Sequence, residues 1–319
     1  MQVFESLEEI PRDFGPTVVS VGNYDGIHRA HRRLIESICR RAKELDARSV
    51  LVTFDPHPTR ILKPHGGPPL ITPMTRKMEL LRESGVDAVA VIPFTRDLSL
   101  MPAFEFAEEI LSNGLHAIEV HEGFNFRFGH KAEADVHRLR EFGSKLGFTV
   151  VAHTPIMWGD MVVSSSNVRA VVLGGKVEIA RHLLGRPFSI DSSPGRGRGY
   201  GTKYTVPTVN LARYEELTPA FGVYVTEMLI DGKNFQSVTN VGNRPTFGVD
   251  SFAIESYILN FHPIDLSSDT PLRLSFLHRL RGEKKFPSVE LLKEQIGKDV
   301  LRAQKYFRLL SATRKGEIV

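Results

Sequence analysis

The sequence predicts two domains of different fold class, an α/β domain with a parallel sheet and then an antiparallel β-barrel domain with a terminal helix. In the first half, short β-branched runs alternate with amphipathic segments of helical spacing. In the second half, strand patterns follow one another without helices between them. The 319 residues exceed what one hydrophobic core usually supports. We therefore expect domains at residues 1–185 and 186–319.

Strand and helix patterns take turns through the first half. The apolar residues of the first helix, from Leu34 to Leu45, recur at helical spacing. The predicted strands are 17–22, 49–54, 87–92, 116–121 and 148–153, and the predicted helices are 31–45, 73–83, 103–113, 134–146, 165–173 and 176–184. Repeated strand–helix units predict a parallel sheet covered by helices on both faces. Ligands of such sheets bind at the carboxyl ends of the strands.

The second half changes character after a segment rich in Gly, Ser and Arg at 188–205. Turn signals such as Asp231-Gly232 separate its short strand patterns. The predicted strands are 208–213, 222–230, 235–241, 253–260 and 271–280. Serial short strands predict an antiparallel barrel or sandwich, and Ser288 to Leu309 reads as a final amphipathic helix.

Composition excludes several classes of protein. A single cysteine, Cys39, rules out an internal disulfide and is typical of a reducing cytoplasm. The first residues are acidic without an apolar segment, so we expect no signal peptide, and no apolar run is long enough for a bilayer. The 41 basic and 37 acidic residues nearly balance, which argues against nucleic-acid binding. We expect a cytoplasmic monomer or weak homo-oligomer without membrane or nucleic-acid partners.

The most informative segment is a polar turn between the first predicted strand and helix. It begins at Gly22, continues through Asp25 and Gly26, and places two histidines, His28 and His31, where the helix starts. Such a turn presents unpaired backbone N–H groups and the positive end of the helix dipole. Two imidazoles at the same turn favour a nucleotide triphosphate site. The alternatives are helix-start histidines without a ligand, or a zinc site, for which no further ligand cluster follows.

A second loop follows the next strand and contains His57. The run Thr53-Phe54-Asp55-Pro56-His57-Pro58 places the histidine between two stiffening prolines. Its position after a strand favours a ligand role, and the alternative is a structural loop with a solvent-facing histidine.

An aromatic segment, Glu122 to Gly129, follows the fourth strand of the first half. Strand alternation predicts Phe124, Phe126 and Phe128 on one side, opposite Asn125 and Arg127. This pattern indicates either an apolar slot for a flat ring or the edge of a hydrophobic core.

The helix predicted at 165–173 opens with Ser164-Ser165-Ser166-Asn167-Val168-Arg169. Hydroxyls at a helix N-terminus either cap the helix or bind phosphate, and Arg169 can then form two hydrogen bonds to phosphate oxygens.

Taken together, these four segments resemble the N-terminal module of the bacterial bifunctional riboflavin kinase/FAD synthetases. That family carries a G-x-F-D-G-x-H-x-G-H turn, a T-F-x-P-H-P loop, a D/N-F-x-F-G stretch and an S-S-T-x-I-R helix start. The matching segments are Gly22 to His31, Thr53 to Pro58, Asn125 to Gly129 and Ser164 to Arg169. Tyr24, Ala30, Ser166 and Val168 differ from the pattern.

The second half extends the resemblance to nearly the whole chain. Pro207-Thr208-Val209-Asn210 looks like the P-T-A-N motif of the kinase module. Gly222-Val223-Tyr224, Asn240 to Phe247, Glu255, and Arg281 with Phe286 also stand where the family has them. Before Pro207 the family reads G-R-x-x-G-F, whereas this chain reads Gly201-Thr202-Lys203-Tyr204-Thr205-Val206.

The resemblance implies a Rossmann-like nucleotidyltransferase domain and a riboflavin kinase barrel, acting on riboflavin, FMN, FAD and ATP with Mg²⁺. For the kinase it implies Glu255 as the base and Thr208 and Asn210 as ligands of the magnesium–nucleotide. For FAD synthesis it implies His28, His31 and Arg169 as catalytic donors. The remaining positions are phosphate contacts at Gly22, Asp25, Gly26, His57, Ser164 and Ser165, and flavin contacts at Asn125, Phe126 and Phe128.

Chemistry supports these assignments. An alcohol needs a base to attack ATP, and a carboxylate at Glu255 in an apolar-alternating strand is costly unless it has a role. An FMN phosphate is already ionised, so donors matter more than a base. The alternatives are an adenylyltransferase with an impaired kinase domain, a non-catalytic flavin- or nucleotide-binding regulator, and an RNA-binding protein.

Overall fold

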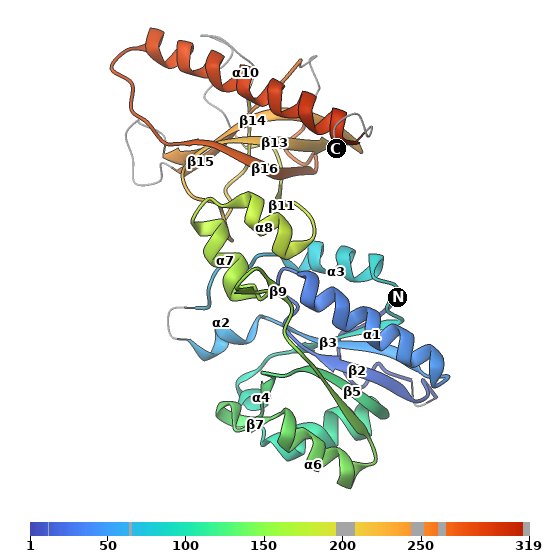
Figure 1. Ribbon diagram of the computed structural model, residues 1–319. Helices are drawn as coiled ribbons and strands as arrows, with labels where there is room; N and C mark the ends of the chain where they lie inside the picture. Colours follow the sequence, from blue (N-terminus) through green and yellow to red (C-terminus); the bar gives the residue numbers. More distant parts are fainter. Residues whose placement is uncertain (12, 64–65, 196–207, 244–251, 261–265, 315–319) are drawn as a thin grey trace. The chain divides into compact units, whose positions relative to one another are not determined.

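A computed structural model describes residues 1–11, 13–63, 66–195, 208–243, 252–260 and 266–314 (Figure 1). The chain divides into two compact units, Met1–Ser165 and Ser166–Val319. Among the described residues, no helix combines the length and apolar character needed to cross a bilayer.

The first unit is built on one parallel sheet, labelled in Figure 1. Every adjacent pair runs parallel, as predicted. In spatial order the strands are β1 (Gln2–Phe4), β4 (Ala88–Pro93), β3 (Arg48–Asp55), β2 (Thr17–Val21), β5 (Ala117–Gly123) and β8 (Thr149–His153). Only β1 escaped prediction, because three residues carry too little periodic signal. The central strand β2 is buried along its whole length, so both sheet faces are covered.

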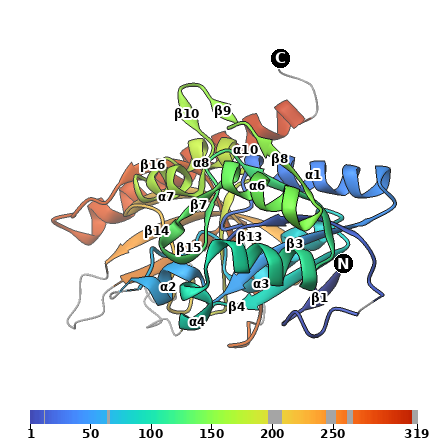
Figure 2. The ribbon, with the colours of Figure 1, turned by 90° about the horizontal axis from the view of Figure 1, so that it is seen from below.

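Helices cover both faces of this sheet, as Figures 1 and 2 show. On one face, α1 (Arg29–Glu44) and α3 (Met74–Glu83) pack their apolar residues against alternate residues of the central strands, Val18, Leu51 and Val89. On the other face lie η1 (Phe106–Gly114), wound as a π-helix, and α6 (Val136–Leu146). The α/β class predicted from the alternation is therefore confirmed.

The start of α6 lies two residues later than predicted. Ala134 pairs with Phe128 in a small antiparallel ladder, and the Asp135 carboxylate accepts the N–H groups of His137 and Arg138 at 3.0 Å. This N-cap begins the helix at Val136. The other short elements are α2 (Pro58–Leu62), α4 (Arg96–Leu100), α5 (Ala103–Glu105), β6 (Arg127–Phe128), η2 (His130–Ala132), β7 (Ala134–Asp135), β9 (Met157–Trp158) and β10 (Met161–Val162).

The second unit is an antiparallel six-stranded sheet. In spatial order its strands are β11 (Phe188–Ser192), β16 (Leu272–Gly282), β13 (Gly222–Ile230), β14 (Lys233–Asn243), β15 (Phe252–Ile258) and β12 (Thr208–Asn210). Just beyond the two edge strands, the Gly195 N–H donates to the Asn210 carbonyl and the Ala212 N–H donates to the Ser193 carbonyl, both at 2.8 Å. These bonds join the edges, so the sheet curls as a barrel does.

The terminal helix α10 (Val289–Arg314) lies against the outer face of this sheet. Ala303 and Phe307 pack on Val223, Val225 and Val238 of β13 and β14. The Arg281 Nε donates to the buried Asp299 carboxylate at 2.9 Å, which ties the helix to β16. An antiparallel barrel with a terminal helix is thus confirmed.

Two helices, α7 (Ser165–Leu173) and α8 (Val177–Leu184), connect the sheets along the chain. By contacts they group with the second unit, where α8 packs on β16 and β11. The predicted division at 185/186 assigned both helices to the α/β domain. That functional division stays a prediction.

Candidate active sites

The first candidate site is the turn between β2 and α1. The Gly22 N–H donates to the Val52 carbonyl at 2.9 Å, which continues the β2–β3 ladder into the turn. Tyr24 (φ 46°), Gly26 (φ 88°) and Ile27 (φ 37°) then adopt left-handed backbone angles within four residues. Such strain persists only where surrounding structure maintains it, and it clusters at functional sites.

The buried Asp25 side chain stabilises this turn through hydrogen bonds to a neighbouring segment. Its side chain is 1% exposed, and its carboxylate accepts the backbone N–H groups of Ile71 and Thr72, each at 3.0 Å. The Asp25 carbonyl accepts the Ser165 hydroxyl at 2.8 Å. The carboxylate thus fixes the turn against the segment that leads into α3.

The two histidines lie together at the start of α1. His28 is the N-cap, and its Nδ1 accepts the His31 N–H at 3.3 Å. The two rings stack with centroids 3.7 Å apart. An Nδ1 that accepts leaves Nε2 to carry the ring proton in the neutral form, so His28 offers an Nε2–H donor. Ala30, which differs from the family glycine, lies inside the helix where alanine is favourable.

His57 caps the next helix. Its Nδ1 accepts the Thr59 N–H at 3.3 Å and contacts the Thr59 hydroxyl at 2.8 Å, which starts α2 at Pro58. The His57 ring is 9% exposed. A capping role therefore accounts for its Nδ1, and the proposed phosphate contact would use the other ring nitrogen.

The predicted aromatic slot is only partly assembled. Phe126 and Phe128 stack with centroids 5.2 Å apart, and Phe128 is buried against Phe142 in the core. Phe124 is 52% exposed, so the prediction that three phenylalanines share one side is wrong for it. The chain turns after β5 ends at Gly123, and strand alternation stops there. Asn125 is exposed and directly precedes Phe126 in the sequence.

The serine cluster marks the boundary between the units. Ser164 precedes α7, Ser165 begins it, and Arg169 lies one turn further along the helix, within the second unit.

The second candidate site lies on the outer face of the barrel sheet. Asn210 of β12 is the direct cross-strand partner of Glu255 of β15, and Glu255 also pairs with Asn240 of β14. Directly paired residues share a sheet face, so one carboxylate lies between two amides. Thr208, paired with Tyr257, lies on the same face. The register therefore brings together Glu255, Asn210 and Thr208.

Two parts of the predicted kinase site lie outside the described residues: the segment Gly201 to Pro207 and the run Arg244 to Phe247. So do the basic residues Arg196 and Arg198. The described donors are hydroxyl, amide and carboxylate oxygens, which suit Mg²⁺. Among the described residues, no group of three or more His, Cys, Asp or Glu side chains surrounds a metal position.

Comparisons with known proteins bear on both sites. A family model described as FAD synthetase matches residues 10–167, and one described as riboflavin kinase matches residues 184–307. The bifunctional riboflavin kinase/FMN adenylyltransferase of Pseudomonas fluorescens is 33% identical over 95% of this chain and 97% of its own length. The chain belongs to this bifunctional family.

Other relatives also match over nearly the whole length of both chains. The protein of the same name from Escherichia coli K12 is 29% identical over 95% of this chain and 96% of its own. A crystal structure described as a macrolide-efflux protein from Streptococcus pneumoniae matches with a TM-score of 0.85 at 25% identity, covering 95% of this chain and 98% of that one.

Membership in the family establishes the class of chemistry. The chain is an enzyme with riboflavin kinase and FMN adenylyltransferase activities, and its substrates and products are riboflavin, FMN, FAD and ATP. Kinases and adenylyltransferases of these families use ATP together with a divalent metal.

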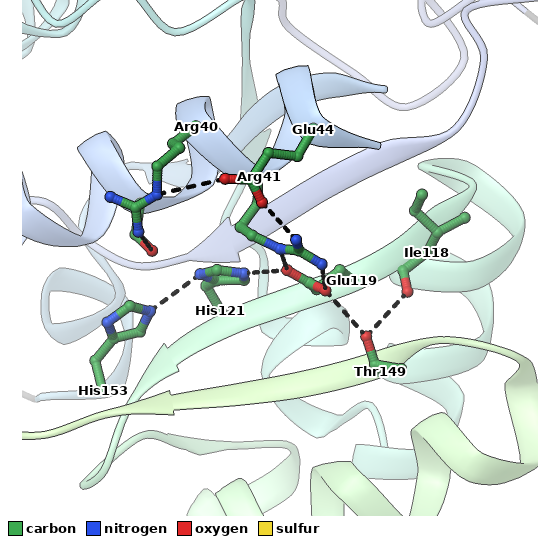
Figure 3. A network of polar contacts seen from close by, with 9 residues as sticks. Arg40, Arg41, Glu44, Ile118, Glu119, His121, Thr149 and His153 are labelled. Carbon is green, nitrogen blue, oxygen red and sulfur yellow. Dashed lines mark hydrogen bonds and ion pairs between the residues drawn. The ribbon is translucent and has the colours of Figure 1, made fainter. Parts of the chain in front are cut away.

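Sequence reasoning missed a polar network between α1, β5 and β8 (Figure 3). Arg41 donates to both oxygens of Glu119 at 2.9 and 3.0 Å, and Glu119 contacts His121 Nε2 at 2.7 Å. His121 Nδ1 lies 3.0 Å from His153 Nε2. The alternation of Glu119 and His121 along a strand was the available signal, since polar side chains at buried positions need partners.

Electrostatics follow from this geometry. The hydrogen bonds from Arg41 lower the pKa of Glu119 to about 2. Burial lowers the pKa of His121 and of His153, and Arg33 and Arg40 act in the same direction on His153. With Glu119 ionised, His121 carries its proton on Nε2, so His153 donates to His121 Nδ1.

Proposed function

We propose that this chain makes FAD from riboflavin in two ATP-dependent steps, with phosphorylation at the Glu255 face of the barrel and adenylylation at the β2–α1 turn. The observation that carries the proposal is that each unit holds a cluster of the predicted functional groups. One is a carboxylate between two amides, and the other is a strained turn leading into a pair of histidines at a helix N-terminus.

In the kinase step, the ribityl 5′-hydroxyl attacks the γ-phosphorus of ATP, and the bond between that phosphorus and the β,γ-bridging oxygen breaks. Glu255 takes the hydroxyl proton, and ADP leaves. Asn210 and Asn240 flank the carboxylate and hold it in place on the sheet. Thr208 and Asn210 offer the oxygens for Mg²⁺, which neutralises phosphate charge when it is bound.

In the adenylylation step, a phosphate oxygen of FMN attacks the α-phosphorus of ATP, and pyrophosphate leaves. The attacking group is already ionised, so the protein contributes position and positive charge. His28 and His31 act as donors, together with the N–H groups of the turn from Gly22 to Gly26. Ser164, the Ser165 backbone N–H and Arg169 add donors to the phosphates, and His57 does so from the neighbouring loop.

The flavin would lie against the Phe126 ring. Phe128 supports that ring from the core, and Asn125 offers an amide for polar contacts.

We further propose that the enzyme acts in the cytoplasm, as a monomer or weak homo-oligomer, without nucleic acid or membrane. The single cysteine and the near balance of charge support this.

The test is a chromatographic assay of the purified chain with ATP, Mg²⁺ and either riboflavin or FMN. We expect FMN and then FAD from riboflavin, and FAD from supplied FMN. Formation of FAD from FMN alone would favour an adenylyltransferase with an impaired kinase domain. If no product formed from either flavin, the non-catalytic binding alternative would replace the proposal.

Glu255→Gln separates the two steps. It removes the base without changing the size of the side chain, so riboflavin phosphorylation should fall by about 10²-fold or more. Adenylylation of supplied FMN should remain at the wild-type rate. Kinase turnover within about threefold of wild type would remove Glu255 from the role of base.

The double variant His28→Ala with His31→Ala should have the opposite effect and impair only adenylylation. It removes two donors at the turn, and loss of even one transition-state donor commonly lowers kcat by about 10²-fold. FAD formation should fail while FMN formation continues. Simultaneous loss of both activities would indicate a folding defect.

A further inference from the structure

The side chain of Lys77 is almost completely buried beside the adenylylation site. It extends from the first turn of α3 and is 3% exposed. Its Nζ lies 3.5 Å from the Thr53 hydroxyl of β3, and that hydroxyl lies 3.4 Å from the Asn23 carbonyl of the β2–α1 turn. The ammonium therefore lies where the two motif segments, Gly22–His31 and Thr53–Pro58, meet.

Two carboxylates act on this ammonium from those same segments. Asp25 belongs to the turn after β2, and Asp55 ends β3. Both raise the pKa of Lys77, and burial lowers it by more, so the net direction is downward. Asp25 also accepts the N–H groups of Ile71 and Thr72, which lead into α3. The Lys77 ammonium, carried by α3, therefore interacts with both the turn after β2 and the loop after β3.

A buried ammonium is costly, and an apolar side chain of the same length usually stabilises a core better. The charge therefore needs a use beyond packing. The site beside it must accept ATP, FMN and the charge that develops on pyrophosphate. A cation already fixed beneath the turn needs no reorganisation during the reaction.

We propose that Lys77 is a positioning residue for FMN adenylylation. Its ammonium holds the Gly22–His31 turn and the Thr53–Pro58 loop in the arrangement that binds the triphosphate, and it adds a fixed positive charge beneath them. This inference rests on the proposed adenylylation site.

The first test compares Lys77→Met and Lys77→Arg, with Lys145→Met, an exposed lysine of α6, as the matched control. We expect Lys77→Met to lower kcat/KM for FAD formation by about 10²-fold and to raise KM for ATP. Lys77→Arg should have a kcat/KM at least tenfold higher than that of Lys77→Met. Lys145→Met should have the wild-type kcat/KM. Cooperative unfolding in urea reports whether each variant is folded, and riboflavin phosphorylation in the same chain should stay at the wild-type rate.

Two results would overturn the inference. One is Lys77→Met with wild-type adenylylation. The other is a loss of adenylylation that Lys77→Arg does not recover and that accompanies loss of cooperative unfolding. A wild-type chain that makes no FAD from FMN would instead overturn the proposed function, so the two failures are distinguishable.

A pH profile supplies a readout that a structural role would not change. Wild-type adenylylation should decline on the alkaline side below the ordinary lysine pKa of about 10.4, as the ammonium loses its proton. In Lys77→Arg this decline should move to higher pH, because a guanidinium does not titrate there. The same alkaline decline in both proteins would contradict the proposal.

Discussion

At the scale of single residues, the β2–α1 turn, where we propose adenylylation, depends on backbone angles that few side chains tolerate. Gly26 has a φ of 88°, and an added Cβ would lie 3.1 Å from the Ile71 Cδ1. Ile71 in turn donates its N–H to Asp25. A methyl group at Gly26 therefore strains the backbone and also pushes on the contact that holds the turn.

Gly26→Ala has a matched control in Gly147→Ala. Gly147 has a φ of 89° at the end of α6, with nothing within 4 Å of its added Cβ. Both substitutions incur the left-handed backbone cost of about 1–2 kcal/mol. Only Gly26→Ala should also lower FAD formation, by at least tenfold. Urea unfolding and the FMN assay measure the two effects, and equal activity in both variants would contradict the expectation.

At the scale of elements, the network of Figure 3 joins α1 to the strands β5 and β8. The helix carries His28 and His31 at its start, and β5 leads into Asn125 and Phe126. The Arg41–Glu119 ion pair and the two histidines of the network therefore connect the helix that carries the proposed ATP donors with the strand that precedes the proposed flavin segment. Because Glu119 and His121 are buried at the centre of the network, its charge state contributes to stability.

The sign of that contribution follows from the pKa shifts. His121 and His153 have lowered pKa values in the folded chain, so below about pH 6.5 the unfolded chain binds protons that the folded chain does not. The free energy of unfolding should fall as pH falls from 7 to 5. Glu119, with a pKa of about 2, keeps its contribution above about pH 4.5 and loses it towards pH 2.

The double variant His121→Gln with His153→Gln tests this pH dependence. Glutamine retains a hydrogen-bonding amide but does not titrate, so the variant should lose much of the slope of unfolding free energy between pH 5 and 7. His137→Gln, at an exposed position on α6, should keep the wild-type slope. Urea titrations at several pH values measure this. A wild-type chain with the same free energy of unfolding at pH 5 and pH 7 would contradict the expected loss of stability at low pH.

At the scale of the whole molecule, the FAD synthetase and riboflavin kinase family models match separate stretches of one chain, residues 10–167 and 184–307. FMN is the product of one site and the substrate of the other. If it is released into solution, the two sites need not be intact in the same molecule.

A mixing experiment examines this independence. Glu255→Gln alone and His28→Ala/His31→Ala alone should each make FAD from riboflavin and ATP at least about 10²-fold more slowly than wild type. Mixed together they should make FAD after a lag that shortens as the concentration of Glu255→Gln rises. If the mixture accumulated FMN without FAD, while Glu255→Gln still adenylylated supplied FMN, release of FMN from the kinase site would be excluded.

Local pattern predicted much of the fold. The strand 222–230 and the helix 165–173 have the predicted bounds, because each carries a clear periodicity between turn signals. Prediction was poorer where periodicity ends. The segment after Gly123 turns, so Phe124 does not join Phe126 and Phe128. The strand predicted at 208–213 ends at Asn210, where its ladder with β15 ends.

The sequence by itself determined the order of elements, the two fold classes and the motifs of the family, because these depend on spacing along the chain. Only the tertiary structure decided that Asn210 and Asn240 flank Glu255, and that Lys77 is buried between two motif loops. It also decided that Arg41 reaches Glu119, 78 residues away. Such pairings depend on strand register and on which surfaces become buried, and these are properties of the folded chain rather than of local periodicity.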